Sequence, residues 1–212
     1  LFFTKEGYFK KITPQSLRMS GEHKLKEGDE ITEHFESTNN TDLIFFSDKC
    51  QAYKSKAVDF ADTKASVLGE YIPSKLSMDE DENAIYMVAT KDYGGYVFFF
   101  YENGKAAKVP LESYATKTNR KKLTGAYSDK DKLAAICYVP NDECELLIKS
   151  SSGRMLLLKA GDILAKTSRT TQGVAVIKLK KGYKVMSACI YEDSMLSKPE
   201  RYRAKTIPSA GQ

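Results

Sequence analysis

Two short loops combine cations, hydroxyl or amide side chains and a glycine, which together could surround a phosphate. Each loop starts 13 residues after a glycine that we place in a hairpin turn, Gly104 or Gly153. We predict phosphate contacts from Lys117, Arg120, Lys121 and Lys122 in the first loop and from Lys166 and Arg169 in the second. The glycine that ends each loop lets the backbone approach a ligand closely. A solvated charged loop is the alternative for one loop alone, but its recurrence at equivalent places favours phosphate contact.

Further cations follow the turns of the predicted hairpins. Strand alternation would place part of them on an outer face. The weaker candidates for phosphate contact are Lys10, Lys11 and Arg154, together with Arg18 in the segment after the first hairpin. For any one of them, an ordinary solvated strand face is the alternative.

The sequence lacks the residue patterns of common catalytic and metal sites. His23 and His34 are the only histidines, and neither has a Cys or His at metal-ligand spacing. The glycine motifs GxGxxG, GxxxxGK[ST] and GxSxG are absent. We therefore predict a segment that is not itself catalytic and that holds no metal and no cofactor.

Composition places the chain among globular proteins with a mild basic excess. Lys and Arg number 33 against 28 Asp and Glu, which gives a net charge of +5 and a pI near 8.8. Such an excess points to nucleic acid only through its placement. No apolar run approaches the roughly 18 residues of a membrane span, so we expect no membrane partner. Four cysteines without a CxxC pair favour free thiols in a reducing cytoplasm.

The chain is repetitive. Four segments read as an apolar strand, a turn and a strand with a basic residue: 1–13, 43–58, 96–110 and 145–160. Their turns, aligned at Gly7, Cys50, Gly104 and Gly153, are 43, 54 and 49 residues apart. A further strand follows each hairpin, at 29–37, 83–91, 132–140 and 183–192. About four strands per unit predict the blades of a propeller-like array, because no unit could bury its apolar face alone.

These repeats define the expected organisation. We place them at about 1–41, 42–95, 96–143 and 144–192, in one all-β domain over residues 1–212. Residues 193–212 are expected to be a strand remnant or a loose tail. Phenylalanines in continuous apolar runs are expected to pack in the core: Phe2, Phe3, Phe45, Phe46, Phe98, Phe99 and Phe100. The chain opens on a strand-like run at Leu1, and we expect it to be a C-terminal fragment of a longer protein.

Several of these motifs resemble the C-terminal domain of bacterial type IIA topoisomerase A subunits. This family comprises the A subunits of DNA gyrase and of topoisomerase IV, and this sequence most resembles that of a clostridial-type member. The segments that carry the resemblance are 3–11, 26–31, 34–47, 116–122 and 169–174. Together these segments extend the resemblance over residues 1 to about 192.

The resemblance implies a β-pinwheel, whose blades exchange strands and whose basic outer rim binds and bends duplex DNA. The repeats in this chain predict about four to five four-stranded blades. The resemblance also implies a parent enzyme, gyrase or topoisomerase IV-like, that passes one duplex through another with ATP and Mg²⁺. Its partners would then be the core of the topoisomerase A subunit, together with an ATPase partner subunit, in the cytoplasm at the nucleoid. The catalytic tyrosine, metal site and ATPase would lie outside this segment.

Two features depart from the family pattern. Gyrases carry a basic, glycine-rich box, QRRGGKG, on the first blade, and residues 16–24 keep only scattered members of it, including Arg18 and Gly21. This departure favours a topoisomerase IV-like role. The family commonly has five or six blades, so four repeats and a tail predict an open or incomplete ring.

We therefore expect a non-catalytic DNA-binding domain that positions a DNA segment for strand passage. A propeller used as a protein-interaction scaffold, without DNA binding, is the alternative, because fold alone does not fix function.

Overall fold

All four predicted hairpins form in the computed structural model, which describes residues 1–117 and 120–212. The hairpins are β1 (Phe2–Thr4) with β2 (Tyr8–Ile12), β4 (Asp42–Ser47) with β5 (Ala52–Lys56), β9 (Tyr96–Tyr101) with β10 (Lys105–Pro110), and β13 (Glu145–Ser150) with β14 (Met155–Lys159). Gly7, Gly104 and Gly153 take the left-handed φ values that tight turns need, at +91°, +91° and +84°. Cys50 takes the same role with a φ of +55°.

The further strand predicted after each hairpin also forms and pairs antiparallel with the hairpin's first strand. These strands are β3 (Ile31–His34) on β1, β8 (Ala84–Thr90) on β4, β12 (Leu133–Val139) on β9 and β16 (Val185–Ile190) on β13. The four sheets that result are here called the first to the fourth sheet, in chain order.

Short strands that cross between repeats agree with the strand exchange that the resemblance implies, although no local pattern in the sequence places them. They are β6 (Asp62–Thr63) and β7 (Glu70–Tyr71) on β2, β11 (Lys122–Leu123) on β5, and β15 (Val174–Ala175) on β10. Each lies beyond the next hairpin in the chain, yet it pairs with the preceding sheet. We call 62–71, 117–126 and 166–177 the exchanged segments, because each repeat lends one to its predecessor.

The C-terminal tail occupies the corresponding place on the fourth sheet. Met155 and Gln212 exchange two backbone hydrogen bonds of 2.9 Å, and Leu157 donates to the carbonyl oxygen of Tyr202 at 2.8 Å. A bridge between Leu157 and Arg203 continues this pairing along β14. Of the two expectations for residues 193–212, the structure supports the strand remnant.

Glycine permits the close approach of these segments to the hairpins. A Cβ atom at Gly69 would lie 2.4 Å from the carbonyl oxygen of Phe9, and one at Gly173 would lie 2.0 Å from that of Ala106. At Gly211 in the tail, the same atom would lie 2.9 Å from the carbonyl oxygen of Met155. The three acceptor residues each stand two positions after a turn glycine, so the tail repeats the contact of the exchanged segments.

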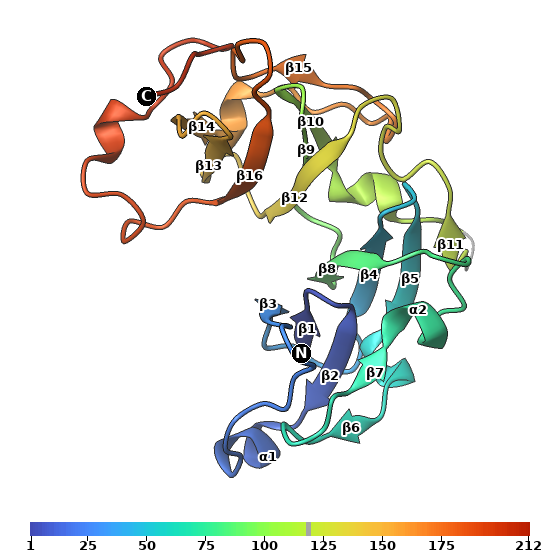
Figure 1. The fold of residues 1–212 in the computed structure, drawn as a ribbon. Coiled ribbons are helices and arrows are strands. Elements are labelled where there is room, and N and C mark those ends of the chain that lie inside the picture. Colours follow the sequence, from blue (N-terminus) through green and yellow to red (C-terminus); the bar gives the residue numbers. More distant parts are fainter. Residues whose placement is uncertain (118–119) are drawn as a thin grey trace. The chain divides into compact units, whose positions relative to one another are not determined.

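The described chain divides into two compact units, each with its own core. Unit 1, Leu1–Asp92 with Lys117–Ala126, holds the first two sheets (Figure 1). Its core is aromatic: the ring centroids of Phe9 and Phe60 are 4.5 Å apart, and Phe45 packs against both rings. Two short helices belong to this unit, α1 (Pro14–Arg18) and α2 (Ile72–Lys75).

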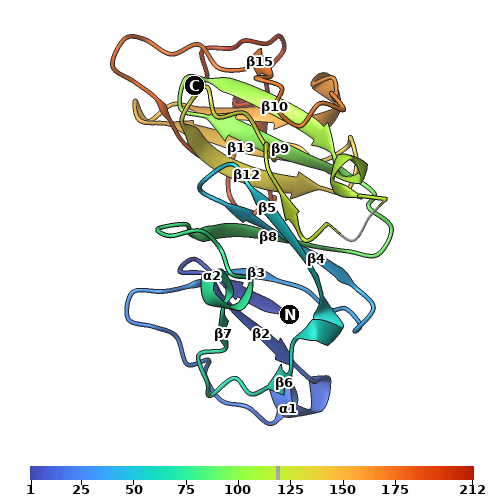
Figure 2. The ribbon, with the colours of Figure 1, turned by 90° about the vertical axis from the view of Figure 1, so that its right-hand side faces the viewer.

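Unit 2, Tyr93–Thr116 with Tyr127–Gln212, holds the third and fourth sheets (Figure 2). Phe98 and Phe100 of β9 stack 5.9 Å apart and pack with Leu146, Ile148 and their neighbours from the fourth sheet. The expected core phenylalanines are fully buried in both units except Phe2. Phe2 is half-buried, with its ring 4.5 Å from that of His23. Single 3₁₀ turns occur at Ala57–Asp59, Leu111–Tyr114, Ala160–Asp162 and Pro199–Arg201.

We predict that Gly173→Ala destabilises unit 2 more than Gly182→Ala does. Both glycines have a positive φ, +75° and +87°, so each substitution costs about 1–2 kcal/mol of backbone strain. Only at Gly173 does the new Cβ also collide with backbone, which adds about 1–3 kcal/mol, since nothing lies within 4 Å of a Cβ at Gly182. Urea unfolding of the two variants measures the difference, and equal losses would contradict the close-approach role of Gly173.

Candidate nucleic-acid interface

The first basic loop is fixed at its base on the second sheet. β11 pairs Lys122 with Tyr53 and Leu123 with Ala52, and the Leu123 side chain is buried. Lys54 donates its backbone N–H to the carbonyl oxygen of Lys121 at 2.7 Å. The backbone at Lys121–Leu123 is therefore held by hydrogen bonds, while the side chains of Lys121 and Lys122 are exposed.

Three cations of this loop, Lys117, Arg120 and Lys121, have exposed side chains. None of them forms an ion pair with a carboxylate among residues 1–117 and 120–212. Thr118 and Asn119, which complete the predicted motif, lie outside the described residues. The three side chains are available to an anionic ligand.

Lys122, the fourth predicted contact in this loop, forms a surface ion pair with another segment of the chain. Its Nζ lies 3.0 Å from Asp79 Oδ1 and 5.8 Å from the centre of the Tyr53 ring. Hydrogen bonds from Gln51 and Lys122 lower the pKa of Asp79, so this carboxylate is charged at neutral pH. A phosphate would have to compete with Asp79 for Lys122.

Asp79 belongs to a buried polar network centred on Glu82, whose side chain is only 3% exposed. Glu82 accepts hydrogen bonds from Tyr53 Oη at 2.6 Å, Gln51 Nε2 at 2.9 Å and the backbone N–H of Asp79 at 2.9 Å, as well as from Ser47. Burial raises the pKa of this carboxyl, but the donors outweigh burial and leave the pKa below its usual value. The acidic run 79–82 thus anchors the base of the basic loop.

The second basic loop is fixed along the third sheet in the same way. Lys166 donates its backbone N–H to the carbonyl oxygen of Lys108 at 2.9 Å, and its side chain is exposed. Arg169 is half-buried: Nη1 donates to the carbonyl oxygen of Ser113 at 3.0 Å, and the guanidinium lies 5.9 Å from the centre of the Tyr114 ring. The half-exposed guanidinium is thus held in one orientation.

Lys10 has a structural position that excludes it from an outer surface. The side chain is 2% exposed, and Nζ donates to the carbonyl oxygens of Lys24 and Ala65 at 2.9 and 3.0 Å. Burial lowers the pKa of this amine. Lys108 of β10 is buried likewise, with Nζ bound to Asp142 and to the carbonyl oxygens of Ala160 and Ile163. Both lysines fasten loops to a hairpin, which strand alternation alone did not reveal.

The other weaker candidates differ in their exposure. Lys11 is largely covered, with Nζ 2.8 Å from Asn39 Oδ1 and 3.5 Å from Asp62. Arg154 is exposed and donates from Nη1 to the carbonyl oxygen of Gly211 at 3.3 Å. Arg18 is exposed in the last turn of α1. Arg18 and Arg154 therefore remain accessible, whereas Lys11 is held inside the first sheet.

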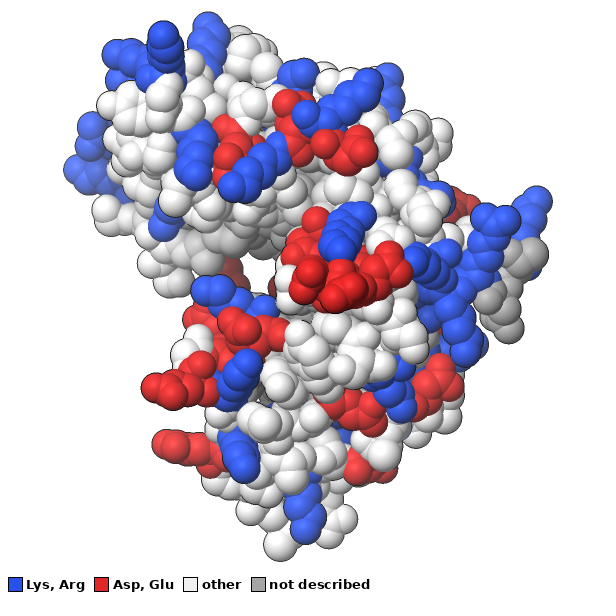
Figure 3. Space-filling view, turned by 45° about the vertical axis from the view of Figure 1, so that its right-hand side comes forward, with Lys and Arg blue, Asp and Glu red and all other residues white. Residues whose placement is uncertain are grey.

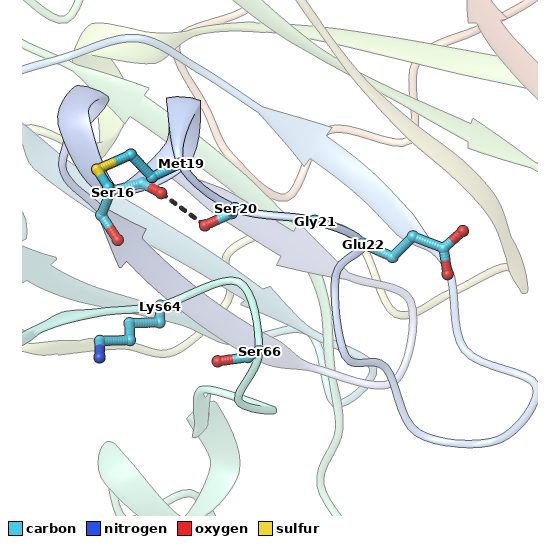
Figure 4. Close-up of a pocket in the computed structure, with 7 residues that line it drawn as sticks. All are labelled: Ser16, Met19, Ser20, Gly21, Glu22, Lys64 and Ser66. Carbon is cyan, nitrogen blue, oxygen red and sulfur yellow. Dashed lines mark hydrogen bonds between the residues drawn. The ribbon is translucent and has the colours of Figure 1, made fainter.

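The stretch that departs from the gyrase box forms α1 and one wall of an open pocket (Figure 4). The pocket has a volume of about 410 Å³ and is lined by Ser16, Met19, Ser20, Gly21, Glu22, Lys64 and Ser66. Ser20 Oγ donates to the carbonyl oxygen of Ser16 at 2.6 Å, which caps the end of α1. With a single lysine and a glutamate in its lining, the pocket lacks the dense positive charge of a QRRGGKG box.

Charges are segregated on the surface. The face in Figure 3 shows a group of Asp and Glu side chains beside a group of Lys and Arg side chains. Three further cations, which the sequence analysis did not select as phosphate contacts, are exposed: Lys178, Lys180 and Lys181. The signal for them was the charge run 178–184, with four lysines and no acid.

The described residues contain no group of metal ligands. Over 1–117 and 120–212, no three His, Cys, Asp or Glu side chains gather as metal ligands would. Within that part of the chain, no helix is long and apolar enough to cross a membrane.

The chain is similar in sequence to proteins of one family. A family model described as the DNA gyrase C-terminal domain, a β-propeller, matches residues 145–188. The A subunit of DNA topoisomerase 4 from Staphylococcus epidermidis is 27% identical over 215 residues, covering 98% of this chain and 26% of that protein. The A subunit of DNA gyrase from Streptomyces coelicolor is 25% identical over 201 residues, covering 87% of this chain and 23% of that protein. The chain thus spans about a quarter of the length of these curated relatives.

Solved structures agree with the sequence comparison. The crystal structure of the C-terminal domain of DNA topoisomerase IV superposes with a TM-score of 0.75 at 22% identity, covering 91% of this chain and 60% of that one. The E. coli ParC C-terminal domain gives a TM-score of 0.70 at 11% identity, covering 100% of this chain and 91% of that one. The predicted resemblance is confirmed: the fold is the all-β pinwheel type of these domains, and the described residues form four of its sheets.

We predict that Glu82→Gln lowers stability at pH 7 and makes the protein less sensitive to acid. A carboxyl whose pKa is lower in the folded state stabilises the protein above its unfolded pKa of about 4.5 and loses this effect as the pH falls through the folded value. Removing the charge from this buried network should cost about 1–3 kcal/mol at pH 7.

Urea unfolding at pH 7 and pH 4 measures both effects, with Glu80→Gln as the matched control because Glu80 is exposed. If Glu82→Gln and Glu80→Gln behaved alike at both pH values, Glu82 would not be the anchor described here.

Proposed function

Because the chain shares the fold and the motifs of the C-terminal domains of type IIA topoisomerase A subunits, we propose that it binds duplex DNA through its exchanged segments. The contacts are to the phosphate backbone, so binding is largely independent of base sequence. The bound duplex is bent and presented as a segment for strand passage, and DNA that bends easily is preferred.

One observation carries this proposal: exposed cations stand on backbone that is hydrogen-bonded to a sheet edge in both units. Lys121 does so beside the second sheet, in the same loop as the exposed Lys117 and Arg120, and Lys166 does so beside the third. Preorganised cations lose little conformational entropy when they bind, and Arg169 adds a guanidinium already fixed in orientation. Arg18 and Arg154 are secondary contacts, while Lys10 and Lys11 are omitted because their ammonium groups are engaged within the protein.

The remaining functions belong to the longer protein that we infer around this segment. ATP, Mg²⁺, the core of the topoisomerase A subunit, and the ATPase partner subunit would act outside residues 1–212, and the segment itself contributes no cofactor. The whole enzyme would work in the cytoplasm at the nucleoid. The pocket beside α1, whose lining carries one lysine and one glutamate, supports a topoisomerase IV-like role over chiral wrapping of the gyrase type.

A protein-interaction scaffold would instead need a large exposed apolar patch. The two most exposed large apolar side chains are Met19, at 82%, and Leu164, at 76%. Each lies within two residues of a candidate phosphate contact, Arg18 or Lys166, which favours the DNA interface over the scaffold.

We predict that binding to a short linear duplex weakens steeply with salt. If about four to six phosphates are neutralised, log affinity against log salt concentration should have a slope of roughly −4 to −5. Fluorescence anisotropy across a salt series measures it, and a slope near zero would rule out the backbone contacts.

The same series applied to a Lys117→Ala, Arg120→Ala, Lys121→Ala variant should show weaker binding to all sequences alike. The slope should become shallower by about 2–3, because up to three phosphate contacts are lost. Unchanged affinity would remove this loop from the interface.

We predict that Asp79→Asn strengthens DNA binding. The substitution releases Lys122 from its ion pair, so one further phosphate contact should steepen the salt slope by about 0.9. Adding Lys122→Ala should abolish the gain. Glu143→Gln is the matched control, because it removes one charge from a comparable exposed pair with Lys159 at 3.3 Å, outside the exchanged segments. An equal gain in both variants would mean that net charge alone is responsible.

A further inference from the structure

The segment that follows each exchanged strand occupies one topological position in three repeats, but its charge differs. After β7, residues 72–83 carry one lysine and four carboxylates. After β11, residues 127–132 carry two lysines and two aspartates. After β15, residues 178–184 carry four lysines and no acid. Because the fold tolerates all three compositions at this position, folding does not require the basic character of 178–184.

The four lysines of 178–184 are exposed, and they differ in their ion pairing. Lys184 lies 3.5 Å from Glu102, which also accepts Lys132 at 3.7 Å. Lys178, Lys180 and Lys181 form no ion pair with any carboxylate in the described part of the chain. Three like charges close together in sequence repel each other, and an anionic ligand would relieve that repulsion.

The backbone of this segment is fixed at both ends. Lys178 donates its N–H to the carbonyl oxygen of Ser209 at 2.7 Å, and Val185 donates to that of Glu102 at 3.0 Å. Between these points, Tyr183 donates to the carbonyl oxygen of Lys180 at 3.1 Å and closes a turn. The lysines are therefore presented on a preorganised loop.

The loop 178–184 directly follows the exchanged segment that carries Lys166 and Arg169. The exchanged segment runs along β10 from Lys166, which is bonded to Lys108, to Val176, which donates to the carbonyl oxygen of Gly104 at 2.9 Å. Four strand residues at about 3.3 Å each separate the two anchor points by about 13 Å, similar to the about 12 Å width of the DNA major groove. Cations at the two ends of β10 could thus reach phosphates on opposite sides of one groove.

We propose that Lys178, Lys180 and Lys181 form a second contact site for the phosphate backbone of duplex DNA, at the other end of β10 from Lys166. This inference rests on the proposed function and deepens it. The third sheet then holds the duplex at two places, whereas the acidic run at the equivalent position after β7 repels it.

The test compares a Lys178→Ala, Lys180→Ala, Lys181→Ala variant of the full chain with wild type, on a short linear duplex across a salt series. The affinity at low salt should fall about 10- to 100-fold and the slope should become shallower by about 2–3. Replacing the same three lysines by arginine should retain both values. Circular dichroism and urea unfolding confirm that the variant folds, since the exposed side chains carry none of the anchoring bonds.

A charge-matched control is Lys5→Ala, Lys26→Ala, Lys91→Ala, in which each exposed lysine precedes an acidic residue. This control should keep the wild-type slope. If wild type binds with a steep slope and both triple variants match it, the second contact site is refuted while the proposed function stands. If both triple variants lose affinity equally, net charge explains the effect and the site is again refuted. If wild type itself fails to bind, the proposed function fails first.

Discussion

A sheet edge leaves a row of backbone N–H and C=O groups without partners, and covering these edges is the constraint on which this fold depends. The second strand of each hairpin has such an edge, and a segment from later in the chain covers it. The approach is so close that glycine is needed at Gly69, Gly173 and Gly211. The second, third and fourth repeats thereby each supply a hydrogen-bonded main-chain segment to the sheet before them.

The placement of the basic residues follows from this exchange. The covering segments must run along the outside of a hairpin, so the cations that they carry face solvent while their backbone is held. Lys10 and Lys108 show the opposite outcome: they are buried beneath loops and bind carbonyl oxygens there. Whether a lysine is an anchor or a candidate contact is decided by the element that carries it.

The repeats and their strands could be predicted from the sequence because they depend on local patterns. Apolar runs such as Leu43–Ser47 and turn glycines such as Gly104 specify hairpins through neighbouring residues alone. The exchanged strands could not be located from local patterns, because two-residue strands such as Val174–Ala175 have no periodicity and acquire their partners from a distant repeat. The same reason explains the acidic run 79–82, whose role depends on Gln51, Tyr53 and Lys122 meeting it in space.

The basic loops can be recognised in the sequence because they recur 13 residues after a turn glycine. The sequence does not show which of their side chains are engaged by other residues of the chain. Lys122 is engaged by Asp79, and Lys178, Lys180 and Lys181 lacked a recurring motif, since the equivalent segments in other repeats are neutral or acidic. We propose that the cations of the exchanged segments and of the loop after β15 contact the duplex. Lysine-reactivity footprinting with and without duplex DNA measures this contact at single residues. Lys117, Lys121, Lys166 and Lys178 should be protected in the bound state while Lys5, Lys26 and Lys91 stay reactive, and equal reactivity of the two groups would contradict this proposal.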